Sequence, residues 1–123
     1  FGQLFQNWMR GCYSAKVKDI FAFVDEFSSL DKESQKEALR FFIQTLELAF
    51  ALPRRSLALA HPIYQELSFK LDGFASVLHP KNTRMAMEVL ETAIHDLSRN
   101  GNAKVILSDA SFKFSNLLRI KGA

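Results

Sequence analysis

The sequence has little of what cross-links or bends a chain. Its 123 residues include one cysteine, three prolines and five glycines. The lone Cys12 cannot form an internal disulfide, and its place in an apolar stripe predicts a buried thiol in a reducing compartment. The low glycine and proline content excludes a turn-rich all-β fold and argues against disorder.

The chain also lacks long apolar runs and a strong charge of one sign. No run approaches the ~18 apolar residues that a membrane span needs, and nothing resembles a signal peptide. The formal net charge is +3, and 16 basic residues are scattered among 13 acidic ones. Totals of this kind do not indicate a nucleic-acid-binding groove. We therefore expect a cytoplasmic protein with no membrane partner.

Apolar residues are plentiful: 48% of the chain is hydrophobic, and 12 residues are phenylalanine. They recur at the i, i+3, i+4 spacing of amphipathic helices, which places them in a stripe along one face of each helix. The first of these stripes includes residue 1. We therefore expect a piece of a longer polypeptide that starts in or just before a helix. The sequence predicts an all-α fold, a single compact bundle of about six helices, over 1–12, 15–30, 32–52, 64–78, 83–97 and 103–118.

Short polar side chains mark the expected helix ends. A side-chain oxygen just before a helix can accept a hydrogen bond from a free backbone N–H of the first turn. The caps expected on this basis are Asp31, then Asn82 or Thr83, and finally Asn102. Asn100 and Gly101 can adopt the left-handed conformation that closes a helix, which predicts a tight hairpin between the last two helices.

Two helices carry more apolar residues than one buried face can use. In the last helix, a second arc of mixed apolar and polar character holds Val105, Asp109, Phe112 and Asn116. In the third helix, a second apolar side holds Phe41, Leu48 and Leu52. Mixed strips of this sort are found where proteins meet. Either another segment of the same domain covers them, or a subunit interface does.

The sequence offers no constellation typical of catalysis. It has no Gly-rich phosphate loop, no GxSxG elbow and no HExxH. His61, His79 and His95 are far apart along the chain, with no cysteine or carboxylate at a ligand-like offset. We therefore expect no catalytic residue, cofactor or metal site.

Three stretches of the chain together resemble a known family. They are "LFQNWMRGCY", "DKESQKEALRFFIQTLE" and "ETAIHDLSRNGNAKVILSDASFKFSNLL". The most specific parts are the WMR-C helix, the Gln35-Lys36 pair followed by LRFF, and the Asn-x-Asn-x-Lys turn. In these parts the chain resembles the C-terminal region of the delta-prime subunit of the bacterial DNA polymerase III clamp loader.

The resemblance implies a non-catalytic role in assembly during DNA replication. Residues 1–123 would be the helical collar domain of a longer chain whose two N-terminal AAA-type modules are missing. Its partners would be the helical domains of other loader subunits, tau/gamma and delta. DNA would be reached only through the ATP-driven complex.

Two other interpretations stay open. The chain could be the equivalent collar domain of the tau/gamma subunit, which an upstream Walker A lysine would reveal. It could instead be a helical DNA-binding module using Lys81, Arg84, Arg99, Lys104 and the Arg54-Arg55 pair. Binding to DNA by such a module would weaken steeply with salt.

Overall fold

The computed structural model describes residues 1–51 and 78–120, and every regular element in those residues is an α-helix. The helices are α1 (Gly2–Ser14), α2 (Val17–Ser28), α3 (Lys32–Ala51), α6 (Pro80–Ser98) and α7 (Ala103–Leu117). The predicted all-α class is thus confirmed. The helix expected over 64–78, together with Leu52, the Arg54-Arg55 pair and His61, lies outside the described residues.

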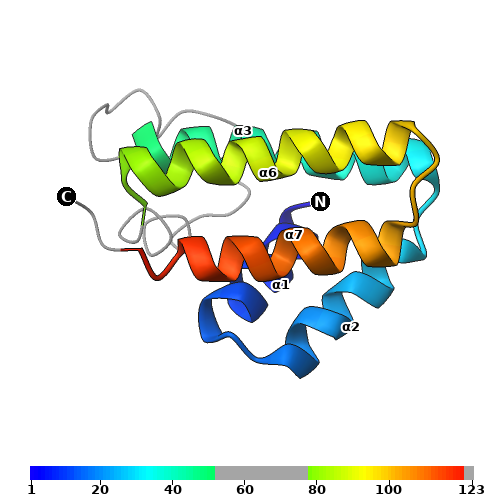
Figure 1. Ribbon diagram of the computed structural model, residues 1–123, viewed down its shortest axis with the longest axis horizontal. Coiled ribbons are helices and arrows are strands. Elements are labelled where there is room, and N and C mark those ends of the chain that lie inside the picture. Colours follow the sequence, from blue (N-terminus) through cyan, green and yellow to red (C-terminus); the bar gives the residue numbers. More distant parts are fainter. Residues whose placement is uncertain (52–77, 121–123) are drawn as a thin grey trace.

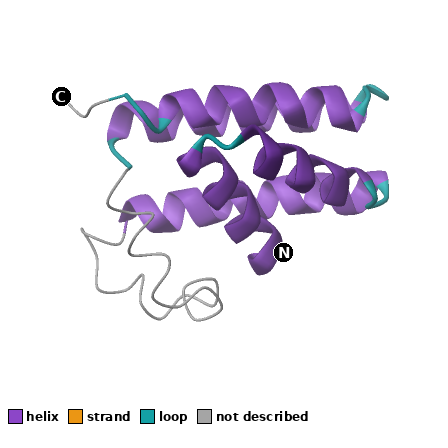
Figure 2. Cartoon of the chain, turned by 90° about the horizontal axis from the view of Figure 1, so that it is seen from below, coloured by secondary structure: helices purple, strands orange, loops and turns teal. Residues whose placement is uncertain are grey.

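The helices stack in two groups (Figure 1). Three long helices run side by side: α3 packs on α6 and α6 packs on α7, each antiparallel to the next. The shorter α1 and α2 pack on each other and on α7, on the side of the molecule that faces the viewer in Figure 2. Since α7 contacts α6, α1 and α2, it is the element that joins the two groups.

Two of the expected caps are confirmed and one is wrong. Asp31 Oδ1 accepts from the Ser34 N–H at 2.8 Å, and Asn102 Oδ1 accepts from the Val105 N–H at 3.2 Å. The fourth described helix, however, begins at Pro80, so its cap is His79 rather than Asn82 or Thr83.

His79 caps α6 with its ring. Nδ1 accepts from the Asn82 backbone N–H at 3.4 Å, and the Asn82 side chain accepts from the His79 backbone N–H at 2.9 Å. Pro80 suits the first helical position because its missing N–H would have had no partner there. The His79 Nε2 lies 2.8 Å from the Ile120 carbonyl oxygen, which links the start of α6 to the end of α7.

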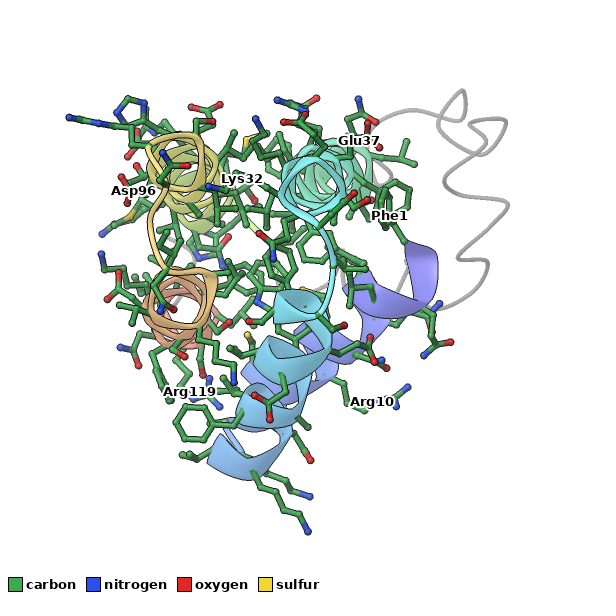
Figure 3. All side chains as sticks on the ribbon, turned by 90° about the vertical axis from the view of Figure 1, so that its right-hand side faces the viewer. Phe1, Arg10, Lys32, Glu37, Asp96 and Arg119 are labelled. Atoms are coloured by element: carbon green, nitrogen blue, oxygen red, sulfur yellow. The ribbon has the colours of Figure 1, made fainter. Side chains whose placement is uncertain are left out.

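The α6–α7 turn is as tight as expected, but its two residues act differently. Asn100 has a left-handed φ of 63°, whereas Gly101 has no positive φ. Glycine is instead needed at position 101 because there is no room for a side chain: an added Cβ would lie 2.8 Å from the Asp96 carbonyl oxygen. The Lys32 ammonium donates to Asn100 Oδ1 at 2.7 Å and ties this turn to the start of α3 (Figure 3).

Trp8 lies at the centre of the core. Its ring stacks on Phe114 of α7 with centroids 4.3 Å apart, and on Phe42 of α3 with centroids 5.1 Å apart. Its indole N–H donates to the Ser111 hydroxyl at 3.0 Å, and both residues are buried. One side chain of α1 therefore holds α3 and α7 in fixed positions.

The C-terminus of α1 is capped from α7. The last carbonyl groups of a helix have no partner within the helix itself. Here the Cys12 carbonyl accepts from the Ser115 hydroxyl at 2.7 Å, and the Tyr13 carbonyl accepts from Arg119 at 2.8 Å. The guanidinium also places a positive charge where the helix dipole favours one. These bonds fix α7, and with it the outer face of α7, against the rest of the fold.

Within residues 1–51 and 78–120, no helix is long and apolar enough to cross a bilayer.

Candidate protein-interaction surface

The strip predicted on the last helix lies at the surface of the structure. Val105 is 67% exposed and Phe112 is 37% exposed, and Asp109 and Asn116 are also exposed. The described segments therefore leave both apolar members of the strip open to solvent. That another protein covers them stays a prediction.

Phe112 does not stand alone at the surface. Its ring meets the ring of Phe21 on α2 edge to face, with centroids 5.9 Å apart and planes at 83°. Phe21 is itself 47% exposed, and Val17, one turn earlier on α2, is 51% exposed. We call Val17, Phe21, Phe112 and Val105 the α2–α7 patch.

The sequence interpretation missed the α2 half of this patch. Helical spacing alone puts Val17, Ile20, Phe21, Val24 and Phe27 on one side of this helix, which predicts that all five are buried. The structure buries Ile20, Val24, Phe27 and also Phe23, but it exposes Val17 and Phe21. The sequence does hold a signal for this difference, which is the width of the apolar arc around the helix axis. With Phe23 included, the six apolar residues span more than the ~100° arc of one core-facing stripe, so residues at one edge of that arc are expected to be exposed.

The second predicted strip is not an exposed surface. Leu48 is only 8% exposed and belongs to the core. Phe41 is half-buried, packs against the core and meets the ring of Phe1 at 6.1 Å between centroids. Leu52 lies outside the described residues. The expectation that α3 presents a second apolar strip is thus corrected: its extra apolar residues widen the core, because α3 has neighbours on two sides.

Two ion pairs border the exposed strip. Lys104 on α7 lies 3.5 Å from Asp25 on α2, and Lys113 lies 2.8 Å from Asp109 one turn away on α7. All four side chains are largely exposed, so these pairs contribute little to stability. They pair four of the charged side chains on α2 and α7 beside the strip.

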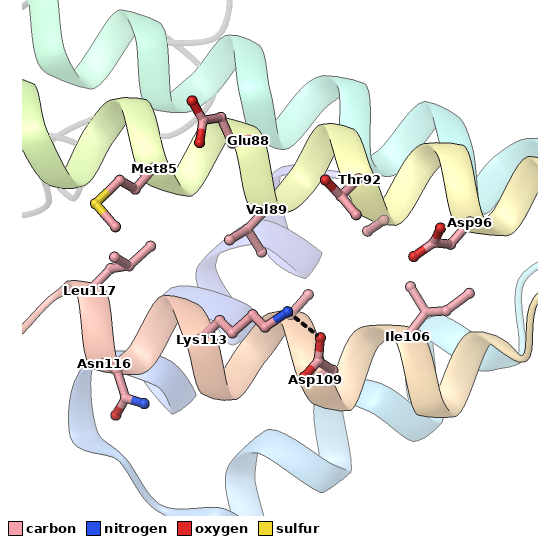
Figure 4. Close-up of a pocket in the computed structure, with 12 residues that line it drawn as sticks. Met85, Glu88, Val89, Thr92, Asp96, Ile106, Asp109, Lys113, Asn116 and Leu117 are labelled. Carbon is pink, nitrogen blue, oxygen red and sulfur yellow. Dashed lines mark ion pairs between the residues drawn. The ribbon is translucent and has the colours of Figure 1, made fainter.

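A groove lies on the other side of α7, between that helix and α6 (Figure 4). Its volume is about 420 Å³. Asp109 and Asn116 line it, so the polar members of the predicted strip border this groove while Phe112 lies toward α2.

Four of the basic residues considered for DNA binding lie in the described part of the chain, and these four do not gather into one surface. Lys81 and Arg84 lie in the first two turns of α6, whereas Arg99 follows its last turn. At 1.5 Å per residue, Arg99 is roughly 27 Å from Lys81 and roughly 22 Å from Arg84. Lys104, beyond the turn, is engaged with Asp25. Lys81, Arg84, Arg99 and Lys104 therefore form no continuous cationic track of the kind that follows a phosphate backbone.

Cys12 and the histidines occupy structural positions. Burial raises the pKa of the Cys12 thiol to about 12, so the reactive thiolate is strongly disfavoured at neutral pH. His79 caps α6 and His95 lies in its last turn. In the part of the chain that the structure describes, no three His, Cys, Asp or Glu side chains are grouped so that they could hold a metal ion.

Comparison with known proteins gives no match: no family model, no curated protein and no solved structure is similar to this chain.

Proposed function

We propose that this chain is a non-catalytic assembly domain that packs against the helical domains of neighbouring subunits. The observation that supports this most directly is the pair of partly exposed rings, Phe21 and Phe112, which meet in an edge-to-face contact outside the core. They come from two helices that are held together by the fold, so their arrangement exists before any partner arrives.

Burial of this patch would favour association. Removing apolar surface from water is worth roughly 25 cal/mol per Å², and rigid aromatic side chains near the centre of an interface commonly carry much of its binding energy. Two rings cannot make a whole interface, since a standard one covers ~800 Å² per partner. The contact would therefore extend over Val17 and Val105 and reach Asp109 and Asn116.

The resemblance supplies the identity of the partners. We propose a clamp-loader collar of the delta-prime type, with the helical domains of tau/gamma and delta as neighbours, in the cytoplasm and acting in DNA replication. A tau/gamma collar is the alternative within the same architecture, and an intact Walker A lysine upstream in the gene would favour it. Because Leu48 is buried and Phe41 is half-buried, the strip on α7 is the one candidate for this contact among the described residues.

The test changes one ring at a time in the chain co-expressed with the other loader subunits. We expect Phe112→Asp and Phe21→Asp each to prevent co-elution in size-exclusion chromatography, because each buries a charge where an apolar side chain is needed. Gln44→Asp, at an exposed position on α3, introduces the same charge away from the patch and should leave assembly intact.

Circular dichroism of the purified variants separates assembly from folding. The proposal expects both ring variants to keep the helical spectrum of the parent chain. Normal co-elution of Phe112→Asp would remove the patch from the interface. Loss of helix in that variant would show that Phe112 serves the fold instead.

A further inference from the structure

The α6–α7 groove has an apolar floor. Ala93 of α6 and Ala110 of α7 both line it and are buried, so each helix contributes a small side chain to the floor. Ridges of larger side chains would normally fill such a position. Because alanine does not, the helices leave a hollow, flanked by Val89 and Ile106, which are only half-buried (Figure 4).

The rim of the groove is acidic, although the chain as a whole is basic. Glu88 and Asp96 of α6 and Asp109 of α7 line it, and the sole cation lining it is Lys113. Lys113 is paired with Asp109 at 2.8 Å. Glu88 and Asp96 form no ion pair within residues 1–51 and 78–120, so neither carboxylate on α6 is paired with a described cation.

These features specify the chemistry of an occupant. Glu88 and Asp96 lie eight positions apart on one helix, which corresponds to roughly 12 Å, or about two turns. An amphipathic helix laid along the groove would place its apolar row over the floor. Two lysine or arginine residues about two turns apart on its edge would then reach both carboxylates.

We propose that the α6–α7 groove is a docking site for a basic amphipathic helix of another protein. Apolar contact with the floor supplies most of the affinity, and the two free carboxylates set the orientation and exclude acidic helices. The groove lies on the α6 side of α7 and shares only Asp109 and Asn116 with the strip proposed for the clamp-loader contact, and its test needs no loader subunit.

The test uses a defined probe. A synthetic peptide of about 18 residues carries a leucine row at helical spacing and two lysines eight positions apart, and a second peptide carries glutamates in place of those lysines. Fluorescence anisotropy at low salt measures the binding of each peptide to the chain. We expect the lysine peptide to bind about tenfold more tightly than the glutamate peptide, with a preference that weakens as salt is added.

Charge reversal makes the test specific to the groove. The double variant Glu88→Lys/Asp96→Lys should invert the preference, so that the glutamate peptide binds better. The double variant Glu37→Lys/Glu91→Lys changes net charge equally at exposed positions that do not line the groove, and it should keep the original preference. Phe112→Asp should also keep it, which separates this site from the α2–α7 patch.

Three results would overturn the proposal. One is the absence of saturable binding of the lysine peptide up to about 1 mM. Another is an equal effect of the two double variants, which would reduce the preference to net charge. The last is a concentration-dependent dimer of the chain that disappears in Glu88→Lys/Asp96→Lys, which would assign the groove to a second copy.

Discussion

Replacing Ser111 by alanine tests how the core is held together. The Ser111 hydroxyl is the acceptor for the Trp8 indole N–H at 3.0 Å, and both side chains are buried. In Ser111→Ala, the stacked rings of Phe42 and Phe114 still fix the indole in place. Its N–H would then point at a methyl group without water to replace the lost acceptor.

The expected cost follows from that unsatisfied donor. A buried polar group left without a partner costs about 1–3 kcal/mol, whereas the gain in helix propensity from serine to alanine is less than about 0.7 kcal/mol. We therefore expect a net destabilisation of about 1–2 kcal/mol. For a chain of this size that corresponds to a fall in Tm of roughly 4–8 °C.

A double-mutant cycle isolates the hydrogen bond from other effects. Trp8→Phe removes the donor, so in that background Ser111→Ala should lose most of its cost and leave a coupling energy of about 1 kcal/mol or more. Unfolding in urea should be followed by far-UV circular dichroism, because Trp8 is the single tryptophan and fluorescence is lost with it. Ser108→Ala on the same helix is the control for propensity.

The reasoning fails if Ser111→Ala is as stable as the parent chain, or if its cost is unchanged in the Trp8→Phe background. Either result would mean that the indole N–H finds another partner or that the hydroxyl matters for a different reason. The ring stack alone would then join α1 to α7.

Three further changes probe the fold. Arg119→Ala should lower stability by about 1 kcal/mol in urea denaturation, because the Tyr13 carbonyl at the end of α1 loses a charged donor, and Arg119→Lys should recover only part of it. Gly101→Ala should cost about 1–3 kcal/mol by the same assay, because the new Cβ would lie 2.8 Å from the Asp96 backbone oxygen, while an Asn100→Gly variant that keeps the turn should cost far less. The thiol of Cys12 should resist a thiol reagent until the chain unfolds. Burial raises its pKa from 9.0 to about 12, so between these pH values the folded state keeps a proton that the unfolded chain releases. The free energy of unfolding is therefore unaffected by this thiol below about pH 9 and falls by about 1.4 kcal/mol per pH unit as pH rises toward 12. Cys12→Ala should remove that slope.

Local signals in the sequence were sufficient for much of the fold. The stripe of α1 from Leu4 to Cys12 and the caps Asp31 and Asn102 are correctly predicted, because each depends on residues within one or two turns of each other. Phe1, where the stripe was expected to begin, is instead 46% exposed. The wrong cap on α6 has a local cause as well. Pro80 favours the first position of a helix, which would have pointed to His79, but histidine is not among the usual capping residues.

Long-range arrangement explains what the sequence could not indicate. Arg119 caps a helix that ends more than a hundred positions earlier in the chain, and no periodicity within α7 marks that role. Likewise, Leu48 and Val105 are both surplus apolar residues on their helices, yet Leu48 is buried and Val105 is exposed. The difference comes from the neighbours of each helix, since α3 packs between α6 and the rings of α1, while Val105 lies on a part of α7 that none of the described helices covers.

The two exposed rings also show how a fold can present an apolar surface and remain stable. The edge-to-face contact between Phe21 and Phe112 is worth about 0.5–1.5 kcal/mol, which is small beside the 5–15 kcal/mol of a typical domain. Replacing either ring by aspartate should therefore leave the core around Trp8 in place, since neither ring contributes to it. The same change would bury a charge in any interface that covers the pair. A large effect on assembly with a small effect on unfolding is thus the signature of a docking surface, and comparable effects on both would indicate that the rings serve only to join α2 to α7.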